Sequence, residues 1–234
     1  MKPFSFLPPL RRVLLGIWGA LTAAGLFVEL WKYVFFGPRT SWVRFLGLSY
    51  EQNLPTWYAS SLLLICSIVL VLIARVKHHE GDRFVWHWYI LSLGFAYISL
   101  DETTTIHEHW SNFFHLDGIF YFGWVIPAGV IVLAGGLFFW PFLRQLPRRP
   151  RLQFATAGAL FVGGALLVEL LLGYWTDIAG THNLVYGLID LVEESLELLG
   201  VTLFLTALLE YGQEPLQSLK LQNAEQFSRV GASN

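Results

Sequence analysis

Four apolar segments of this chain carry acidic side chains at positions where a membrane helix would normally hold no charge. Glu29, Asp101 and Glu169 each follow an arginine at the start of a segment by about 17 or 18 residues, or on the order of 26 Å of α-helix. A fourth segment, read in the opposite direction, carries Asp190, Glu193, Glu194 and Glu197. Charge inside a bilayer is costly and usually marks an ion pathway, a proton relay or a ligand site. We therefore expect these acids to form one site.

A histidine-containing motif closes the third of these segments, at residues 99–110. Its acidic and imidazole side chains are Asp101, Glu102, His107, Glu108 and His109. If the helix continues through the motif, Asp101, Thr105 and Glu108 lie on one face and Glu102 lies on the adjacent strip. The motif would then present carboxylate and imidazole groups to a single pocket.

Carboxylates close together in a medium of low dielectric repel one another, so such a group must hold protons or bind cations. Oxygen ligands suit Mg²⁺ or Ca²⁺, whereas added imidazole shifts the preference toward Zn²⁺, Fe²⁺ or Mn²⁺. We expect a divalent metal ion, with Zn, Fe or Mn preferred over Mg or Ca. The expected ligands are Glu29, Asp101, Glu102, His107, Glu108, His109, Glu169, Asp190, Glu194 and Glu197.

The composition places the chain in a membrane. Of its 234 residues, 55% are hydrophobic and only 14% are charged, which is too apolar for an ordinary soluble domain. Runs of about 20 residues or more, long enough to cross a bilayer as helices, occur near 12–36, 57–75, 84–102, 119–142, 152–175 and 184–210. We predict an all-α bundle of six transmembrane helices over residues 1–212, followed by a polar cytoplasmic tail over 213–234.

The basic residues are distributed unevenly around the predicted helices. Most of them precede the first helix, follow the sixth, or lie between the second and third or the fourth and fifth. The opposite side has Arg39 and Arg44, with Lys32 near the end of the first helix. Because positive residues favour the cytoplasmic side, we expect both termini in the cytoplasm, the acids in the outer half of the membrane, and a location in the bacterial cytoplasmic (inner) membrane.

The alternation of single and clustered acids on four helices resembles the ferritin-like di-iron and di-manganese carboxylate proteins, which use two single Glu residues and two Glu-x-x-His pairs. The match is incomplete, because Glu194-x-x-Glu197 contains no His. The Leu-Asp-Glu at 100–102 is similar to a motif of alkaline ceramidase-like hydrolases, whose zinc-binding His-x3-His helix is absent here. Together with Ile-His-Glu at 106–108, it also resembles bacterial membrane proteins with no assigned activity, and that resemblance implies no function.

These residues favour a metal-dependent enzyme acting on a lipid or another hydrophobic substrate, although they do not establish that the chain is an enzyme. One alternative is a cation or proton transporter that uses the same acids, which would need polar groups continuing toward the cytoplasm. The inner halves of the predicted helices contain few of them, among them Thr202, Thr206 and Glu210, so the sequence gives a continuous path little support. Another is a non-catalytic subunit of a membrane complex. The expected partners are membrane lipids and a second copy or a membrane complex, and the sequence contains no motif for nucleic acid.

Purely structural explanations compete with each of these assignments. The acids and histidines at 101–109 could belong to a solvated helix end that emerges from the membrane. Glu29 and Glu169 could be buried, hydrogen-bonded residues that hold neighbouring helices together. Only the relative positions of the four segments can separate these explanations.

Overall fold

The computed structural model describes residues 7–35, 41–107 and 116–213, and within them it contains helices and no β-strand. The α-helices are α1 (Leu7–Leu30), α2 (Ser41–Leu46), α3 (Leu54–His79), α4 (Val85–Thr104), α6 (Val125–Gln145), α7 (Arg148–Val162), α8 (Glu169–Ala179) and α9 (Leu184–Tyr211). Two π-helical turns, η1 (Trp31–Phe35) and η3 (Gly163–Val168), extend α1 and join α7 to α8, and η2 (Gly118–Phe120) is a short 3₁₀ helix.

Four helical segments are long and apolar enough to cross a membrane. They are Leu7–Val34, Leu54–His79, Val125–Gln145 and Arg148–Ala179. The prediction of an all-helical fold is confirmed for the described part of the chain. The further prediction of six crossings would add α4 and α9, which are 20 and 28 residues long.

The predicted start of the fourth membrane helix was wrong by several residues. The sequence placed it near residue 119, whereas α6 begins at Val125 and a separate 3₁₀ turn precedes it. Pro127 then lies in the first turn of α6, where its missing N–H costs nothing because the first turn has no carbonyl partner for it.

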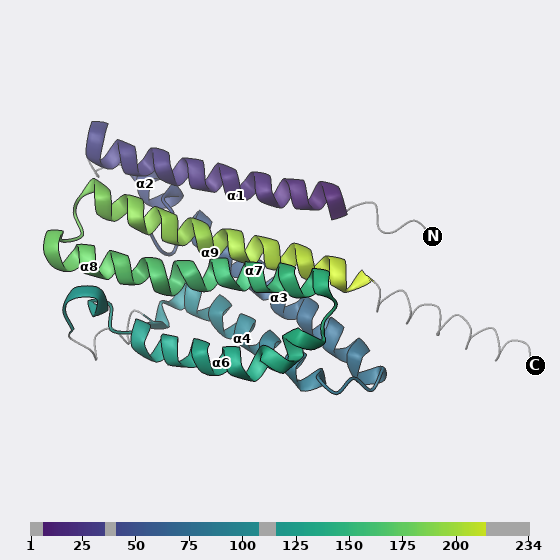
Figure 1. Cartoon of the computed structure of the whole chain (residues 1–234). Coiled ribbons are helices and arrows are strands. Elements are labelled where there is room, and N and C mark those ends of the chain that lie inside the picture. The colour runs from purple at the N-terminus through teal and green to yellow at the C-terminus, as the bar shows by residue number, and fades with distance from the viewer. Residues whose placement is uncertain (1–6, 36–40, 108–115, 214–234) are drawn as a thin grey trace, which may run out of the picture.

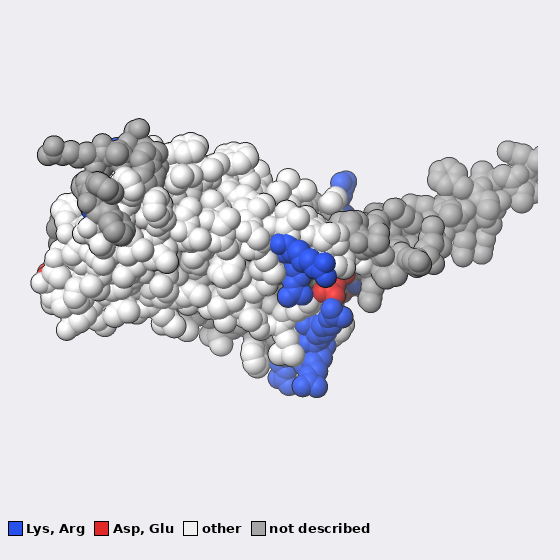
Figure 2. Space-filling model, turned by 90° about the horizontal axis from the view of Figure 1, so that it is seen from above, with Lys and Arg blue, Asp and Glu red and all other residues white. Residues whose placement is uncertain are grey.

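The helices form an elongated bundle in which α9 packs against α1, α3, α7 and α8, as Figure 1 shows. The first described turn of α1 and the last turn of α9 lie at the same end of this bundle. Figure 2 shows that basic side chains gather near one end of the face it presents, while the rest of that face is almost free of charge.

The helices are joined by buried apolar side chains and by small polar contacts. Leu63, Cys66 and Trp88 are almost completely buried between α3, α4 and α9, and the hydroxyl groups of Ser67 and Ser92 lie 3.0 Å apart between α3 and α4. The outer face of α6 is apolar and open: Leu133 and Leu137 are 71% and 79% exposed. A lipid-facing helix has this pattern, because hydrocarbon covers side chains that water would not.

Two glycines bring α7 and η3 close to the central helix. A Cβ atom at Gly200 would lie 2.8 Å from the carbonyl oxygen of Ala157, and one at Gly164 would lie 2.9 Å from the carbonyl oxygen of Glu193. Both approaches are to backbone atoms, so a larger residue would force the helices apart. The close packing at Gly164 falls on the stretch of α9 that carries the acids.

Candidate functional site: a buried carboxylate cluster

The start of α9 is fixed by a side-chain cap. Asn183 accepts a hydrogen bond from the backbone N–H of Tyr186 at 2.9 Å, and its side-chain oxygen also accepts one from Nε1 of Trp175 on α8 at 2.8 Å. An Asn cap satisfies an N–H group that has no partner inside the helix. It also ties α9 to α8, and so sets the position from which the acids of α9 project.

Acidic side chains from three helices meet in the interior of the bundle. We define the carboxylate cluster as Glu102 of α4, Glu169 of α8, and Asp190, Glu193, Glu194 and Glu197 of α9. Glu194 interacts electrostatically with Glu102 and Glu197, and Glu197 interacts with Glu102 and Glu169. Glu102, Glu194 and Glu197 line a small cavity of ≈ 20 Å³ together with apolar side chains such as Leu63 and Phe161, which is room for about one water molecule.

Two acids of the cluster, Glu169 and Glu193, lie next to each other. Their carboxyl groups are in hydrogen-bonding contact, and the two residues are only 8% and 7% exposed. Two ionised carboxylates cannot share a hydrogen bond, because neither has a hydrogen to donate. A hydrogen bond between these two carboxyl groups would place a proton on one of them, and among the described residues Oε2 of Glu193 has no hydrogen-bond partner.

The helix that carries Asp101 is shorter than the sequence suggested, so Asp101 does not belong to a longer helical face. The helix ends at Thr104, and Thr105 adopts the left-handed conformation (φ 54°, ψ 39°), which is unusual for a β-branched residue. The chain then turns back, so that Asp101 accepts the backbone N–H of His107 at 2.9 Å and lies 2.8 Å from its Nδ1. The condition for a face shared by Asp101, Thr105 and Glu108, a helix that continues beyond Thr104, is therefore not met, and Glu108 lies outside the described residues.

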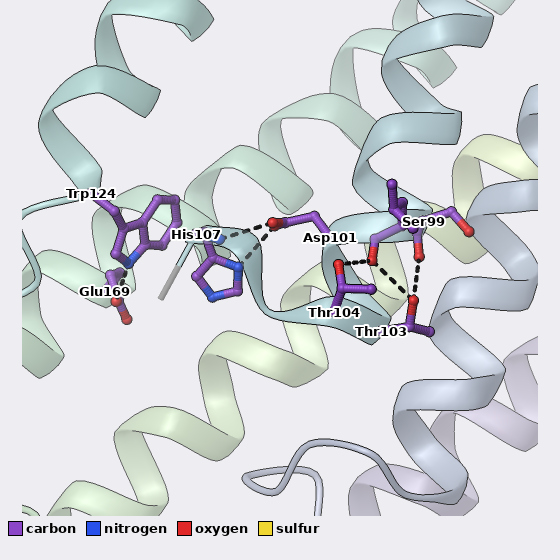
Figure 3. A network of polar contacts seen from close by, with 8 residues as sticks. Ser99, Asp101, Thr103, Thr104, His107, Trp124 and Glu169 are labelled. Carbon is purple, nitrogen blue, oxygen red and sulfur yellow. Dashed lines mark hydrogen bonds and ion pairs between the residues drawn. The ribbon is translucent and has the colours of Figure 1, made fainter. Parts of the chain in front are cut away.

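A chain of contacts leads from this turn to the cluster, and Figure 3 shows it from close by. The ring of His107 lies 4.9 Å from the ring of Trp124. Trp124 in turn donates its Nε1 hydrogen to Oε1 of Glu169 at 2.9 Å. These contacts connect the end of α4 to Glu169, by way of Asp101, His107 and Trp124.

Glu29 is buried in a separate ion pair at the edge of the cluster. It is 1% exposed, and its Oε1 and Oε2 atoms accept hydrogen bonds from Nζ of Lys32 at 2.8 and 2.9 Å. The carboxylate passes directly over Gly187 of α9, where an added Cβ would overlap Oε2 of Glu29. Glycine is required at this position because the carboxylate occupies the space of a side chain.

Both single glutamates lie next to a π-helical turn. Glu29 comes two residues before η1, and Glu169 directly follows η3. A π turn holds one residue more than an α turn and so changes the face on which the next side chains lie, and such turns are frequent at functional sites. Here η3 determines the direction in which Glu169 approaches α9.

The predicted site residues fall into four groups. Glu102, Glu169, Asp190, Glu194 and Glu197 belong to the cluster, Asp101 and His107 pair beside it, Glu29 pairs with Lys32, and Glu108 and His109 lie outside the described residues. The sequence did not identify roles for Lys32 and Trp124 and did not include Glu193 among the ligands. The i, i+3 spacing of Glu29 and Lys32 was the available signal for the ion pair.

The described residues do not form a ready-made metal site. Within residues 7–35, 41–107 and 116–213, no three His, Cys, Asp or Glu side chains are placed so that they could hold a metal ion together. The basic side chains that pair with the acids of this region are Lys32 and His107. Among the described residues these bases pair with Glu29 and Asp101, and acids gathered in a low-dielectric interior are stabilised by protons or by a cation.

These features define an all-helical protein with apolar helices of membrane-crossing length and a carboxylate cluster in its interior. Residues 14–211 match the family described as a domain of unknown function, DUF8692, and the chain belongs to this family. The match extends from α1 to the last residue of α9, so it includes every member of the cluster. No curated protein and no solved structure matches the chain.

Proposed function

We propose that this chain is an integral membrane protein of six transmembrane helices that takes up and releases protons at its carboxylate cluster, as a proton-coupled transporter does. The observation that carries the proposal is the contact between the buried carboxyl groups of Glu169 and Glu193. A proton on one of these two carboxyl groups would stabilise the contact, and the other acids nearby provide sites to which a proton can move. The metal-dependent enzyme favoured by the sequence becomes the second candidate.

Access from the outer side is supported by the Asp101 and His107 pair. The two side chains are 17% and 31% exposed, so they lie between the surface and the buried acids. An imidazole can accept a proton at one nitrogen and release one from the other. His107 is thus a suitable entry group. Trp124, which contacts the His107 ring and donates its indole N–H to Glu169, holds the two in position but does not itself relay a proton.

Access from the other side is supported by polar side chains on α9 beyond the cluster. Thr202 is completely buried, and its hydroxyl group has no hydrogen-bond partner in the described part of the chain. Thr206 and Glu210 follow at intervals of four residues, close to one turn. Glu210 accepts a hydrogen bond from Gln153 at 2.8 Å and forms an ion pair with Arg149. The basic residues at this end favour the cytoplasmic side of a bacterial inner membrane, with both termini there.

Infrared spectroscopy of the purified protein tests the central claim. A protonated carboxyl group has a C=O band separate from that of a carboxylate, so its intensity counts the protons held at neutral pH. We expect this band in the native protein and a weaker one in Glu193→Gln, which cannot hold the shared proton. The control is Glu80→Gln, which removes an exposed acid paired with Lys77 and should leave the band unchanged. A native protein without the band at neutral pH would contradict the proposal.

The second candidate is a divalent metal site, with Zn, Fe or Mn preferred over Mg or Ca, in an enzyme acting on a lipid or another hydrophobic substrate. It is favoured by His107, whose ring is held by Asp101 and which interacts electrostatically with Glu102. A histidine oriented by a carboxylate is common among metal ligands. Glu108 and His109, which the sequence also predicts as ligands, lie outside the described residues.

Elemental analysis of protein purified without chelators distinguishes the two candidates. The second candidate predicts one or more bound metal ions per chain and their loss in His107→Ala and in Glu194→Gln. The proton proposal predicts no bound metal and a protonated carboxyl band in the same sample. Glu80→Gln again serves as the control, because its carboxylate lies outside the cluster.

A further inference from the structure

A pocket opens on the surface of the bundle between α2 and the start of α3. Residues 44–45 and 49–53 line it, and its volume is ≈ 660 Å³, within the range of about 300–1,000 Å³ that is typical of small-molecule sites. In Figure 1, α2 lies near the end of the bundle opposite to the first described turn of α1 and the last turn of α9. The pocket therefore lies at the end that the proposed topology places at the outer surface of the membrane.

The polar wall of this pocket is held in place by Asn53. Its side-chain N–H groups donate to the carbonyl oxygens of Arg44 at 3.1 Å and of Gly47 at 2.6 Å, and its side-chain oxygen accepts the N–H of Thr56 at 3.0 Å. One side chain thus ties α2, the following loop and the first turn of α3 together. A pocket that is fixed before a ligand arrives loses less conformational entropy on binding.

Arg44 supplies the positive charge of the pocket. Its guanidinium carbon lies 5.8 Å from the ring centre of Tyr50, and the ammonium nitrogen of Lys32 lies 4.8 Å from the same ring. Glu29 pairs with Lys32, whereas Arg44 forms no ion pair within the part of the chain that the structure describes. The charge of Arg44 is thus available to an anionic ligand, and a guanidinium group can bind phosphate through two parallel hydrogen bonds.

The other side chains of the pocket restrict the kind of anion that fits. Glu51 lines the same pocket and is exposed, so a ligand with both an anionic and a cationic group fits better than a simple anion, which Glu51 would repel. Phe45 of the pocket wall is 56% exposed, and Trp57 in the first turn of α3 is 65% exposed. Exposed aromatic side chains are typical of the membrane interface, where lipid headgroups lie.

We propose that this pocket binds the headgroup of a zwitterionic phospholipid, with the phosphate at Arg44 and a primary ammonium group at Glu51. The acyl chains of the lipid extend past Phe45 and Trp57 into the hydrocarbon. The inference goes beyond proton exchange, because it requires only that the bundle lies in a membrane. It assigns lipid recognition to α2 and the loop that follows it.

Native mass spectrometry of the detergent-purified protein, titrated with phosphatidylethanolamine or phosphatidylglycerol, measures the affinity for each lipid. We expect tighter binding of phosphatidylethanolamine, and a loss of this affinity by about tenfold or more in Arg44→Gln, which removes the charged partner of the phosphate. The matched control is Arg83→Gln, which removes another exposed arginine beside an aromatic ring, that of Phe84 at 4.6 Å. This control should keep the native affinity, and equal losses in the two variants would overturn the inference.

Glu51→Gln tests the other half of the pocket independently. It should weaken phosphatidylethanolamine by about tenfold and leave phosphatidylglycerol unaffected, because only the first lipid has an ammonium group. An unchanged preference between the two lipids in this variant contradicts the assignment of Glu51.

A soluble zwitterion is distinguished from a lipid by glycerophosphoethanolamine, which has the same headgroup without acyl chains. It should displace the lipid only at a concentration at least about 100-fold higher, because it cannot bury hydrocarbon. Displacement at equal concentration would show that the pocket takes a soluble ligand, and the proposal of a lipid would be wrong. Failure of the proton proposal is recognised separately, since the infrared band is measured in the native protein without added lipid.

Discussion

Replacing Glu197 with glutamine is expected to reduce proton flux across a membrane containing the protein by about 100-fold, the usual contribution of a well-placed proton-transfer group. Glu197 lines the cavity with Glu102 and Glu194 and interacts electrostatically with Glu169 as well. It therefore lies between the α4 and α8 sides of the cluster. Glutamine has nearly the same shape, but its amide cannot take up and release a proton at neutral pH.

Proteoliposomes with an entrapped pH-sensitive dye provide the measurement. A potassium diffusion potential drives the flux, and the initial rate of the internal pH change is compared between the native protein and the variants. The matched control is Glu80→Gln, an equal chemical change at an exposed acid outside the cluster, which should retain the native rate. Equal rates in native protein and Glu197→Gln would refute a role of the cluster in proton movement.

Replacing Lys32 with methionine should lower the free energy of unfolding by about 3–5 kcal/mol, because it leaves Glu29 as an unpaired acid in the bundle. Glu29 is 1% exposed and is held on both oxygens by Lys32. Part of this loss should be recovered by adding Glu29→Gln, since the double variant no longer buries an unpaired carboxyl group. Unfolding of the detergent-solubilised protein by a denaturing detergent gives the comparison.

The chain contains a close control for this variant. Lys77 and Glu80 form an ion pair of the same i, i+3 spacing at 2.7 Å, but their side chains are 16% and 37% exposed. Exposed pairs contribute about 0–1 kcal/mol, because water and salt screen the charges. Lys77→Met should therefore have a small effect. If the two methionine variants lose the same stability, burial of the Lys32 and Glu29 pair is not what makes it strong.

A local signal in the sequence indicates where α4 ends. Residues 103–105 are three consecutive threonines, and β-branched residues that also hydrogen-bond to nearby carbonyl groups are weak helix formers. In the structure Thr103 and Thr104 both donate to the carbonyl oxygen of Leu100, at 2.9 and 2.7 Å. The helix ends there, and the turn at Thr105 brings His107 back to Asp101.

The sequence by itself determined the elements and the kind of residue that they carry. The apolar runs predicted long helices, because burying about 20 residues in hydrocarbon requires every backbone group to bond within its own helix. The spacing of the acids along α9 likewise placed them on one side of that helix, since helical periodicity is a local property. These inferences needed no knowledge of the neighbouring helices.

Only the tertiary structure decided which acids come together in the interior and which one is paired with a lysine. The contact of Glu169 with Glu193 depends on the π turn before Glu169 and on the close approach at Gly164. The burial of Glu29 depends on the space left by Gly187 on another helix. Such contacts join residues that are far apart in the chain, and they are fixed by how helices pack against one another, which the periodicity of a single segment does not specify.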